Sequence, residues 1–262
     1  YSTWPVHKET VLKYVDIDDR NGEWTRPGNF VCNGPFQLKS WELNSKIIVD
    51  KNPFYWDAKK VKLNEIHFYP VQNTMTEDRM FRAGQLHLTS SLPSQKCPIY
   101  IEENNPNLRI DPYMGTYFYR FNTKHPVLKD VKVRKALAYA INRTQLVEKV
   151  TKCGQIPAYS FTPPDPNAYN PPTRLDFDPE KAKKLMREAG FEGNNLPTIE
   201  LLYNTSEGHQ KIAEALQQMW KQTLGIDIVL TNTDWKVYLD KQNTAVSYTH
   251  LRAHETGRNL VC

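Results

Sequence analysis

Residues 130–143 read DVKVRKALAYAINR and carry the clearest helical pattern in the chain. Val133, Leu137 and Ile141 recur every four residues and form one apolar stripe. Asp130 stands just before the stripe, where its carboxylate can accept a backbone N–H that the first helical turn leaves unpaired. The pattern therefore predicts an amphipathic core helix over residues 130–143.

Four further motifs stand in order around this helix. Residues 34–41 read GPFQLKSW and residues 52–56 read NPFYW, both before it. Residues 177–185 read FDPEKAKKL and residues 201–206 read LLYNTS, both after it. A single motif of this kind would be a weak signal, whereas five in the right order are specific.

Together these motifs resemble family 5 of the extracellular solute-binding proteins, which serve peptide ABC importers, and within it the oligopeptide-binding members. The resemblance covers residues 10–243. It implies an α/β fold with two lobes, of the periplasmic binding protein type II kind, truncated at both ends. Residues 1–114 would form part of the first lobe, with a mixed sheet, and residues 115–243 part of the second. A hinge would lie near residues 113–115, with Gly115 absorbing changes in backbone angles.

Local patterns add to this outline. Alternation predicts strands over residues 36–41 and 45–50, joined as a hairpin, and a short strand over residues 86–89. Residues 93–104 predict a helix broken by Pro98, and the aromatic residues 54–56 are expected to pack under the sheet. After residue 116, strand and helix patterns alternate, which favours βαβ units in the second lobe.

The end of the chain departs from the family. Residues 247–258 have no counterpart there and look like translated adapter sequence, so we expect residues 244–262 to be a non-native tail. His250, His254 and Cys262 match no standard zinc-ligand spacing. The three remaining cysteines, Cys32, Cys97 and Cys153, have no paired spacing and do not predict a disulfide framework. The bridge of close relatives would begin at position 115, which is glycine here.

Composition excludes several classes of protein. The net charge of +5 arises from 34 basic and 29 acidic residues that are interspersed, so no basic block points to nucleic acid or a membrane surface. No run approaches the ~20 apolar residues of a membrane span. The sequence begins at Tyr1 without a signal peptide, and we interpret it as an internal fragment of a periplasmic protein.

The sequence lacks the common motifs of catalytic and cofactor sites. The sequence contains no H-E-x-x-H, no G-x-S-x-G and no glycine-rich phosphate loop. We therefore expect no enzyme activity, no cofactor and no metal. A metal-dependent hydrolase that uses His209 and a carboxylate remains the alternative from another class.

Candidate binding residues follow from the resemblance, position by position. The positions that correspond to the ligand-binding cleft of the family are Tyr113, Phe118, Arg120, Asn204, His209 and Trp235. Leu239 is added because it lies one helical turn after Trp235 on the same face, and Ser91 is a weaker candidate for a polar contact. Arg120 replaces a glutamate of close relatives, which predicts a preference for acidic ligand side chains. Thr151 replaces a lysine that can pair with a ligand carboxylate.

The function implied by the resemblance is capture of oligopeptides in the periplasm, between two lobes that close about a hinge. A monomer would then dock on the membrane permease of an ABC transporter. Dipeptides, murein peptides, nickel chelates and haem are alternative cargoes within the same fold. A structural surface protein without any ligand is a third possibility.

Overall fold

The computed structural model describes residues 5–16, 22–111, 115–164, 169–172, 174–191 and 197–241 and, for the backbone alone, residues 242–244 and 251–254. The chain forms two compact units, residues 1–72 and residues 73–262. The lobe boundary at 114/115 stays a prediction.

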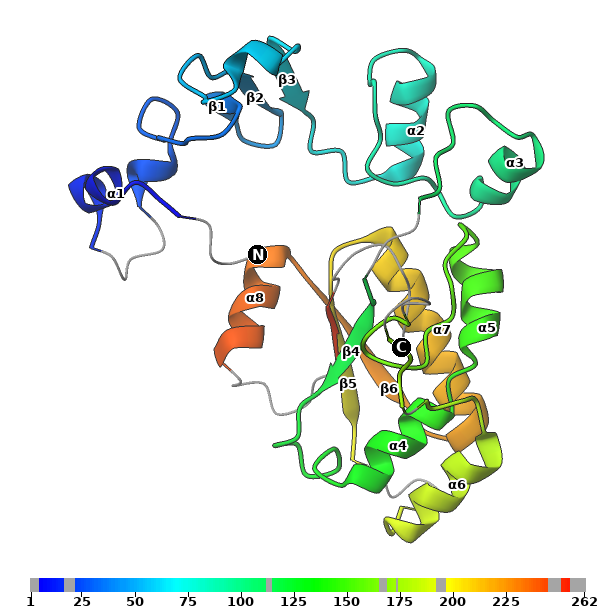
Figure 1. Cartoon of the computed structure of the whole chain (residues 1–262). Coiled ribbons are helices and arrows are strands. Elements are labelled where there is room, and N and C mark those ends of the chain that lie inside the picture. The colour runs from blue at the N-terminus through cyan, green and yellow to red at the C-terminus, as the bar shows by residue number, and fades with distance from the viewer. Residues whose placement is uncertain are drawn as a thin grey trace. The chain divides into compact units, whose positions relative to one another are not determined.

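The first unit is built on a three-stranded antiparallel sheet. Its strands β1 (Phe36–Glu42), β2 (Lys46–Lys51) and β3 (Glu65–Phe68) are neighbours in that order (Figure 1). The predicted hairpin is present, and Asn44 in its turn adopts a positive φ of 58°, which asparagine tolerates better than most residues. The unit also contains helix α1 (Lys8–Tyr14) and the short 3₁₀ turns η1 (Glu23–Thr25) and η2 (Ala58–Lys60).

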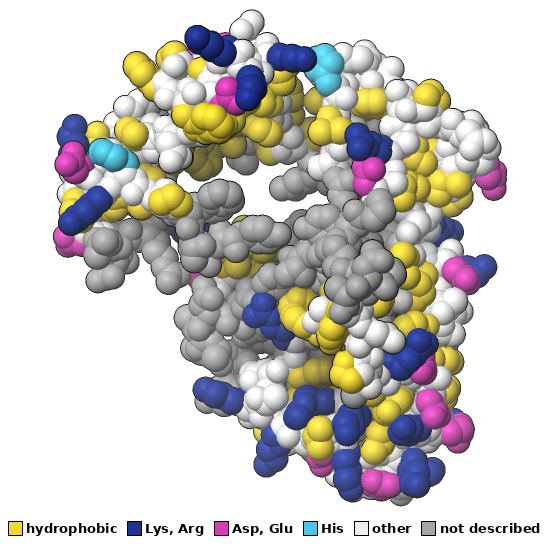
Figure 2. Space-filling view, in the orientation of Figure 1, with side chains coloured by type: hydrophobic (Ala, Val, Ile, Leu, Met, Phe, Trp, Pro, Cys, Tyr) yellow, Lys and Arg dark blue, Asp and Glu magenta, His cyan; other side chains and the backbone are white. Residues whose placement is uncertain are grey.

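Two of the sequence motifs meet at one buried side chain in this unit. The Asn52 amide donates to the Gly34 carbonyl over 2.9 Å, and its oxygen accepts the Phe54 N–H over 3.0 Å. The prediction that residues 54–56 pack under the sheet is wrong for Phe54, which is 91% exposed, and for Trp56, which is 83% exposed, whereas Tyr55 is half-buried. Hydrophobic side chains are visible over the surface of this unit in Figure 2.

The second unit is an α/β layer structure. Its sheet has the order β4 (Phe118–Phe121), β7 (Leu251–His254), β5 (Ile199–Asn204) and β6 (Ile228–Thr233). Strands β5 and β6 are parallel and are joined by helix α7 (Glu207–Leu224), a βαβ unit as predicted. Figure 1 shows α7 on one side of the sheet and helix α8 (Trp235–Thr244) on the other.

The helix predicted over residues 130–143 begins as expected and ends earlier. Asp130 caps α4 (Val131–Tyr139), accepting the Lys132 N–H over 2.7 Å. Asn142 then caps a separate helix, α5 (Arg143–Leu146), by accepting the Gln145 N–H over 3.0 Å. The predicted single helix is therefore wrong at its C-terminal end, because a second N-cap residue interrupts it.

The core of the second unit lies between the sheet and the helices α4, α6 (Pro179–Glu188) and α7. Val133, Leu137 and Leu216 are fully buried there. Trp220 of α7 is 1% exposed, and its indole N–H donates to the Leu137 carbonyl over 2.9 Å. The apolar stripe that predicted a core helix thus does face the core.

Helices α2 (Thr74–Arg82) and α3 (Cys97–Glu102) come first in the second unit. Pro98 lies in the first turn of α3 and does not break it, since the first N–H groups of a helix need no intrahelical acceptor. The strand predicted over residues 86–89 is absent from this described segment. Leu88 is 85% exposed there, so the short alternation reflects no buried face.

A disulfide joins Cys97 at the start of α3 to Cys153, with Cα atoms 5.3 Å apart. Cys153 follows the π-helix η3 (Val147–Thr151) and Lys152, whose φ is 60°. The sequence predicted no such pairing, because the partners are 56 residues apart and only folding brings them together. Cys32 is a free thiol in the first unit.

Strand β7 falls within the predicted non-native tail. It pairs antiparallel with β4 and parallel with β5, so the described sheet includes residues that the sequence analysis set aside. The non-native origin of residues 244–262 stays a prediction. Within the described residues, no helix combines the length and the apolar character needed to cross a bilayer.

Candidate functional site

The carboxyl edge of strands β5 and β6 brings three of the predicted residues to one region. Asn204 ends β5 and pairs in register with Thr233, the last residue of β6. His209 lies in the first turn of α7, and Trp235 begins α8 directly after β6. In parallel α/β sheets, ligands bind at the carboxyl ends of the strands. We define Asn204, His209 and Trp235 as the edge cluster.

A short hydrogen bond fixes the imidazole of the edge cluster. His209 Nδ1 lies 2.9 Å from Asn204 Oδ1, and an amide oxygen can only accept. His209 therefore carries a proton on Nδ1, which leaves Nε2 as an acceptor in the neutral ring and a donor in the charged one. The ring also lies 5.5 Å from that of Tyr117, which is 3% exposed.

Helix α7 adds a second feature favourable to anions. It is 18 residues long, and its N-cap, Ser206, makes no side-chain cap bond. The N-terminus of such a helix presents backbone N–H groups and the positive end of its dipole. With His209 in the same turn, this end of α7 suits a carboxylate.

Trp235 offers an apolar surface beside these polar groups. Its ring is stacked on that of Tyr238, with centroids 5.6 Å apart and planes at 15°. Tyr238 is buried, whereas Trp235 is 57% exposed, so a fixed ring supports an accessible one. Leu239, on the same helix, is half-buried.

Phe118 and Arg120 point to the face of β4 opposite Tyr117, because side chains alternate along a strand. The Arg120 guanidinium lies 5.6 Å from the centre of the Phe118 ring, within cation–π range. Phe118 in turn meets Phe161 edge-on at 4.8 Å. Phe161 belongs to the proline-rich loop, residues 157–172 of the sequence, and was not predicted, since nothing local shows which strand a loop residue will reach.

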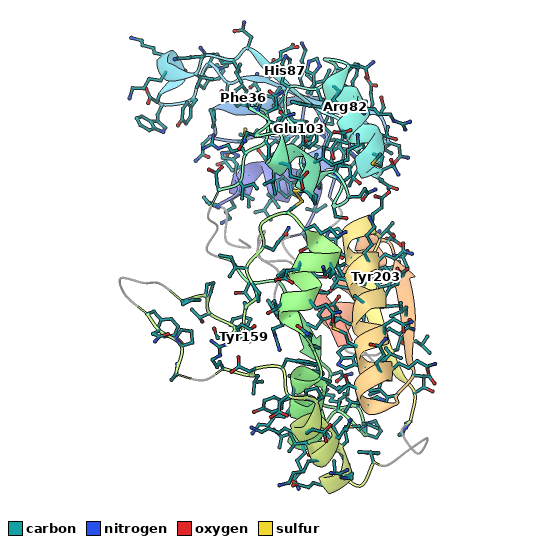
Figure 3. The ribbon with its side chains drawn as sticks, turned by 90° about the vertical axis from the view of Figure 1, so that its right-hand side faces the viewer. Phe36, Arg82, His87, Glu103, Tyr159 and Tyr203 are labelled. Atoms are coloured by element: carbon teal, nitrogen blue, oxygen red, sulfur yellow. A yellow bond between two sulfur atoms is a disulfide. The ribbon has the colours of Figure 1, made fainter. Side chains whose placement is uncertain are left out.

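Cation–π contacts hold the same loop in place. Tyr159, labelled in Figure 3, has the Arg174 guanidinium 4.2 Å and the Arg143 guanidinium 5.7 Å from its ring centre. Arg143 also donates to the Leu175 carbonyl over 3.1 Å. These contacts hold both ends of the loop against α5.

The remaining predicted residues are placed as follows. Tyr113 lies outside the described residues. Gly115 is buried, and Ser91 is exposed next to Ser90, whose N–H and hydroxyl bond to Glu77. Thr151 is 8% exposed, and its hydroxyl donates to the Val147 carbonyl inside the π-helix.

A polar groove of about 600 Å³ lies elsewhere in the second unit and was not predicted. Its walls include Lys149, Lys152 and Lys211, together with Gln95 and Glu214. Among the described residues, no cluster of three or more His, Cys, Asp or Glu side chains could hold a metal ion.

Comparison with known proteins identifies the family. The model of the bacterial extracellular solute-binding proteins, family 5 (middle region), matches residues 3–251. This chain belongs to that family. The identification made from the sequence motifs is confirmed.

Individual relatives agree with the family. The periplasmic oligopeptide-binding protein OppA of Salmonella typhimurium is 37% identical over 249 residues, which are 92% of this chain and 45% of OppA. The chain thus spans about half the length of the curated relatives that it matches.

Solved structures confirm the predicted fold class, the two-lobed α/β binding protein. The murein tripeptide-binding protein MppA of Escherichia coli superposes with a TM-score of 0.84 at 34% identity, over 95% of this chain and 49% of MppA. OppA of Haemophilus influenzae in complex with the peptide RPPGFSPFR gives 0.80 at 31% identity, again over 95% and 49%. The unliganded open form of MppA gives only 0.53 over the same share of this chain.

Proposed function

We propose that this chain is part of the substrate-binding component of a peptide ABC import system. It captures oligopeptides in the periplasm and delivers them, as a monomer, to a membrane permease. It performs no chemistry on its cargo and uses neither cofactor nor nucleic acid. The observation that carries the proposal is the edge cluster, an oriented imidazole at a helix N-terminus beside an exposed tryptophan.

The chemistry of the edge cluster suits a ligand whose side chains vary. Peptides of different sequence share a backbone, one positive end and one negative end. The N–H groups of α7 supply donors for the carboxylate end, and His209 adds one through Nε2 when the ring is protonated. Trp235 supplies an apolar platform that accepts many side chains without a fixed partner. Arg120 adds a positive charge that favours an acidic side chain.

The test is native mass spectrometry of the chain with an equimolar library of short peptides. Binding of several peptides of one length class is expected. His209→Ala should weaken the affinity for the best peptide about 10- to 150-fold, since a hydrogen bond to a charged group contributes about 1.5–3 kcal/mol. His87→Ala replaces an exposed histidine far from the edge cluster in sequence and serves as the matched control, with unchanged affinity.

Other outcomes would point elsewhere. Selective binding of a dipeptide, a murein peptide, a nickel chelate or haem would keep the fold and change the cargo. Peptide cleavage that stops after chelator treatment would show that the protein is a metal-dependent hydrolase and would refute the proposal. A chain that binds nothing in the library would refute peptide capture.

A further inference from the structure

The Cys97–Cys153 disulfide links two segments that the sequence assigns to different lobes. Cys97 precedes the predicted hinge at residues 113–115, and Cys153 follows it. Cys97 is 1% exposed, so the bond lies inside a packed contact. Figure 3 shows this region below the label of Glu103, the C-cap residue that follows α3.

Two sets of hydrogen bonds cross the same predicted boundary. The Glu207 carboxylate accepts from Asn73 Nδ2 over 2.7 Å and from Thr74 Oγ1 over 2.8 Å. The Lys211 ammonium donates to Gln95 Oε1 over 3.2 Å. The start of α2 and the approach to α3 are therefore both attached to α7.

These links explain why the compact units divide at 72/73. Residues 73–102 share a unit with the α/β sheet, although the sequence places them in the first lobe. Hydrogen bonds of this kind can break and reform during a lobe movement. The disulfide does not break during such a movement, so the two segments that it joins must move together.

A relative, MppA, adopts different arrangements of the part that this chain matches. The same share of this chain matches two structures of MppA with TM-scores of 0.84 and 0.53, the second being the unliganded open form. MppA therefore adopts at least two arrangements within the part that this chain covers.

We propose that the Cys97–Cys153 disulfide is a covalent lock that fixes α3 to the α/β sheet unit and moves the flexible boundary from residues 113–115 to 72/73. Where the disulfide is formed, residues 73–102 travel with the second lobe. Where it is reduced, they are free to separate from it. The proposal rests on the proposed function only in assuming that the lobes open and close.

Formation of the lock is ordinary thiol–disulfide exchange with a disulfide-bearing oxidant, such as a periplasmic dithiol oxidase or oxidised glutathione. The thiolate of one cysteine attacks the oxidant's disulfide and releases one oxidant thiol. The second cysteine thiolate then displaces the other oxidant thiol. Two protein thiols lose two electrons and two protons, and the oxidant's disulfide gains them.

The first experiment is peptide mapping of the intact chain without reduction, after alkylation of free thiols. A cross-linked pair of peptides that contains Cys97 and Cys153 is expected. Recovery of both cysteines in alkylated form from oxidised protein would overturn the proposal.

The second experiment is hydrogen exchange of the backbone amides of α3 and residues 147–152. Oxidised chain, chain reduced with a phosphine, and the C97S/C153S variant are compared without peptide. Exchange at least tenfold faster is expected in the reduced chain and the variant, with C32S as the control that stays at the oxidised rate. Equal rates within twofold in all samples would refute the lock.

Peptide binding measured by native mass spectrometry on the same samples separates the two proposals. If no sample binds peptide while the exchange difference persists, the lock stands and the proposed function fails. Because the reduced wild-type chain needs no substitution, a variant that misfolds does not decide the result.

Discussion

Asp78→Asn is expected to destabilise the second unit by removing a buried charge that joins α2 to α3. The Asp78 side chain is 2% exposed. It pairs with the Lys96 ammonium, accepts from Arg82 Nε over 3.0 Å and accepts from the Tyr100 hydroxyl over 2.9 Å. An asparagine can keep the bond from Tyr100 but cannot balance the two cations.

The magnitude follows from the exposure of each partner. Arg82 is 53% exposed and its pair contributes little. Lys96 is only 22% exposed, so solvent screens its bond to the carboxylate little and the bond contributes most of its free energy to stability. A hydrogen bond to a charged group contributes about 1.5–3 kcal/mol, and we expect the free energy of unfolding to fall by about 2–3 kcal/mol.

Urea denaturation followed by circular dichroism measures this change. Glu180→Gln is the matched control, because Glu180 is 81% exposed in its pair with Lys183 and should cost less than about 0.5 kcal/mol. A loss below about 1 kcal/mol for Asp78→Asn would refute the argument that this charge is desolvated and paired.

The pH dependence of stability provides a second readout of the same group. Burial alone would raise the pKa of Asp78, but the hydrogen bonds from Lys96 and Tyr100 outweigh it and hold the pKa below its usual value of 3.8. The contribution of Asp78 to stability is therefore complete above pH 3.8 and is lost as the pH falls through the lowered pKa. Asp78→Asn should flatten this acid limb.

Three further predictions concern single side chains. His125 is buried, its Nδ1 accepts two backbone N–H groups, and burial lowers its pKa. The free energy of unfolding should therefore fall as the pH drops below 6.5, because the unfolded state binds the proton first. In thermal melts, the melting temperature of His125→Asn should depend less steeply on pH in this range. Trp220→Phe should cost about 1–3 kcal/mol in chemical denaturation by leaving the Leu137 carbonyl without its donor, whereas a cost below about 0.5 kcal/mol would contradict the packing described. Arg120→Glu should reverse the preference from acidic to basic peptides in competition binding, and an unchanged ranking would show that Arg120 does not meet the ligand.

Local signals in the sequence predicted much of the fold. The Asp130 cap and the stripe of α4 depend on residues within a few positions of one another, and the β5–α7–β6 unit follows from three consecutive local patterns. Asn204 and His209 were both named from the resemblance, and the structure joins them by a direct hydrogen bond. Their distance in sequence is short enough for one strand-to-helix corner to place both.

Features that depend on distant partners were not predictable in this way. The Asp78 cluster joins two helices, and the disulfide spans 56 residues. Phe161 reaches Phe118 from a proline-rich loop whose path no local pattern specifies. The short alternation over residues 86–89 was misread because four residues cannot show whether a face is buried.

The uneven distribution of the core has a calorimetric consequence. Among the described residues of the first unit, Val11 is the one buried hydrophobic side chain, whereas the second unit buries the apolar faces of α4, α7 and the sheet. The heat capacity increase on unfolding arises from newly exposed apolar surface. The larger share of that increase therefore belongs to the second unit, and its unfolding contributes most of the curvature of the stability curve.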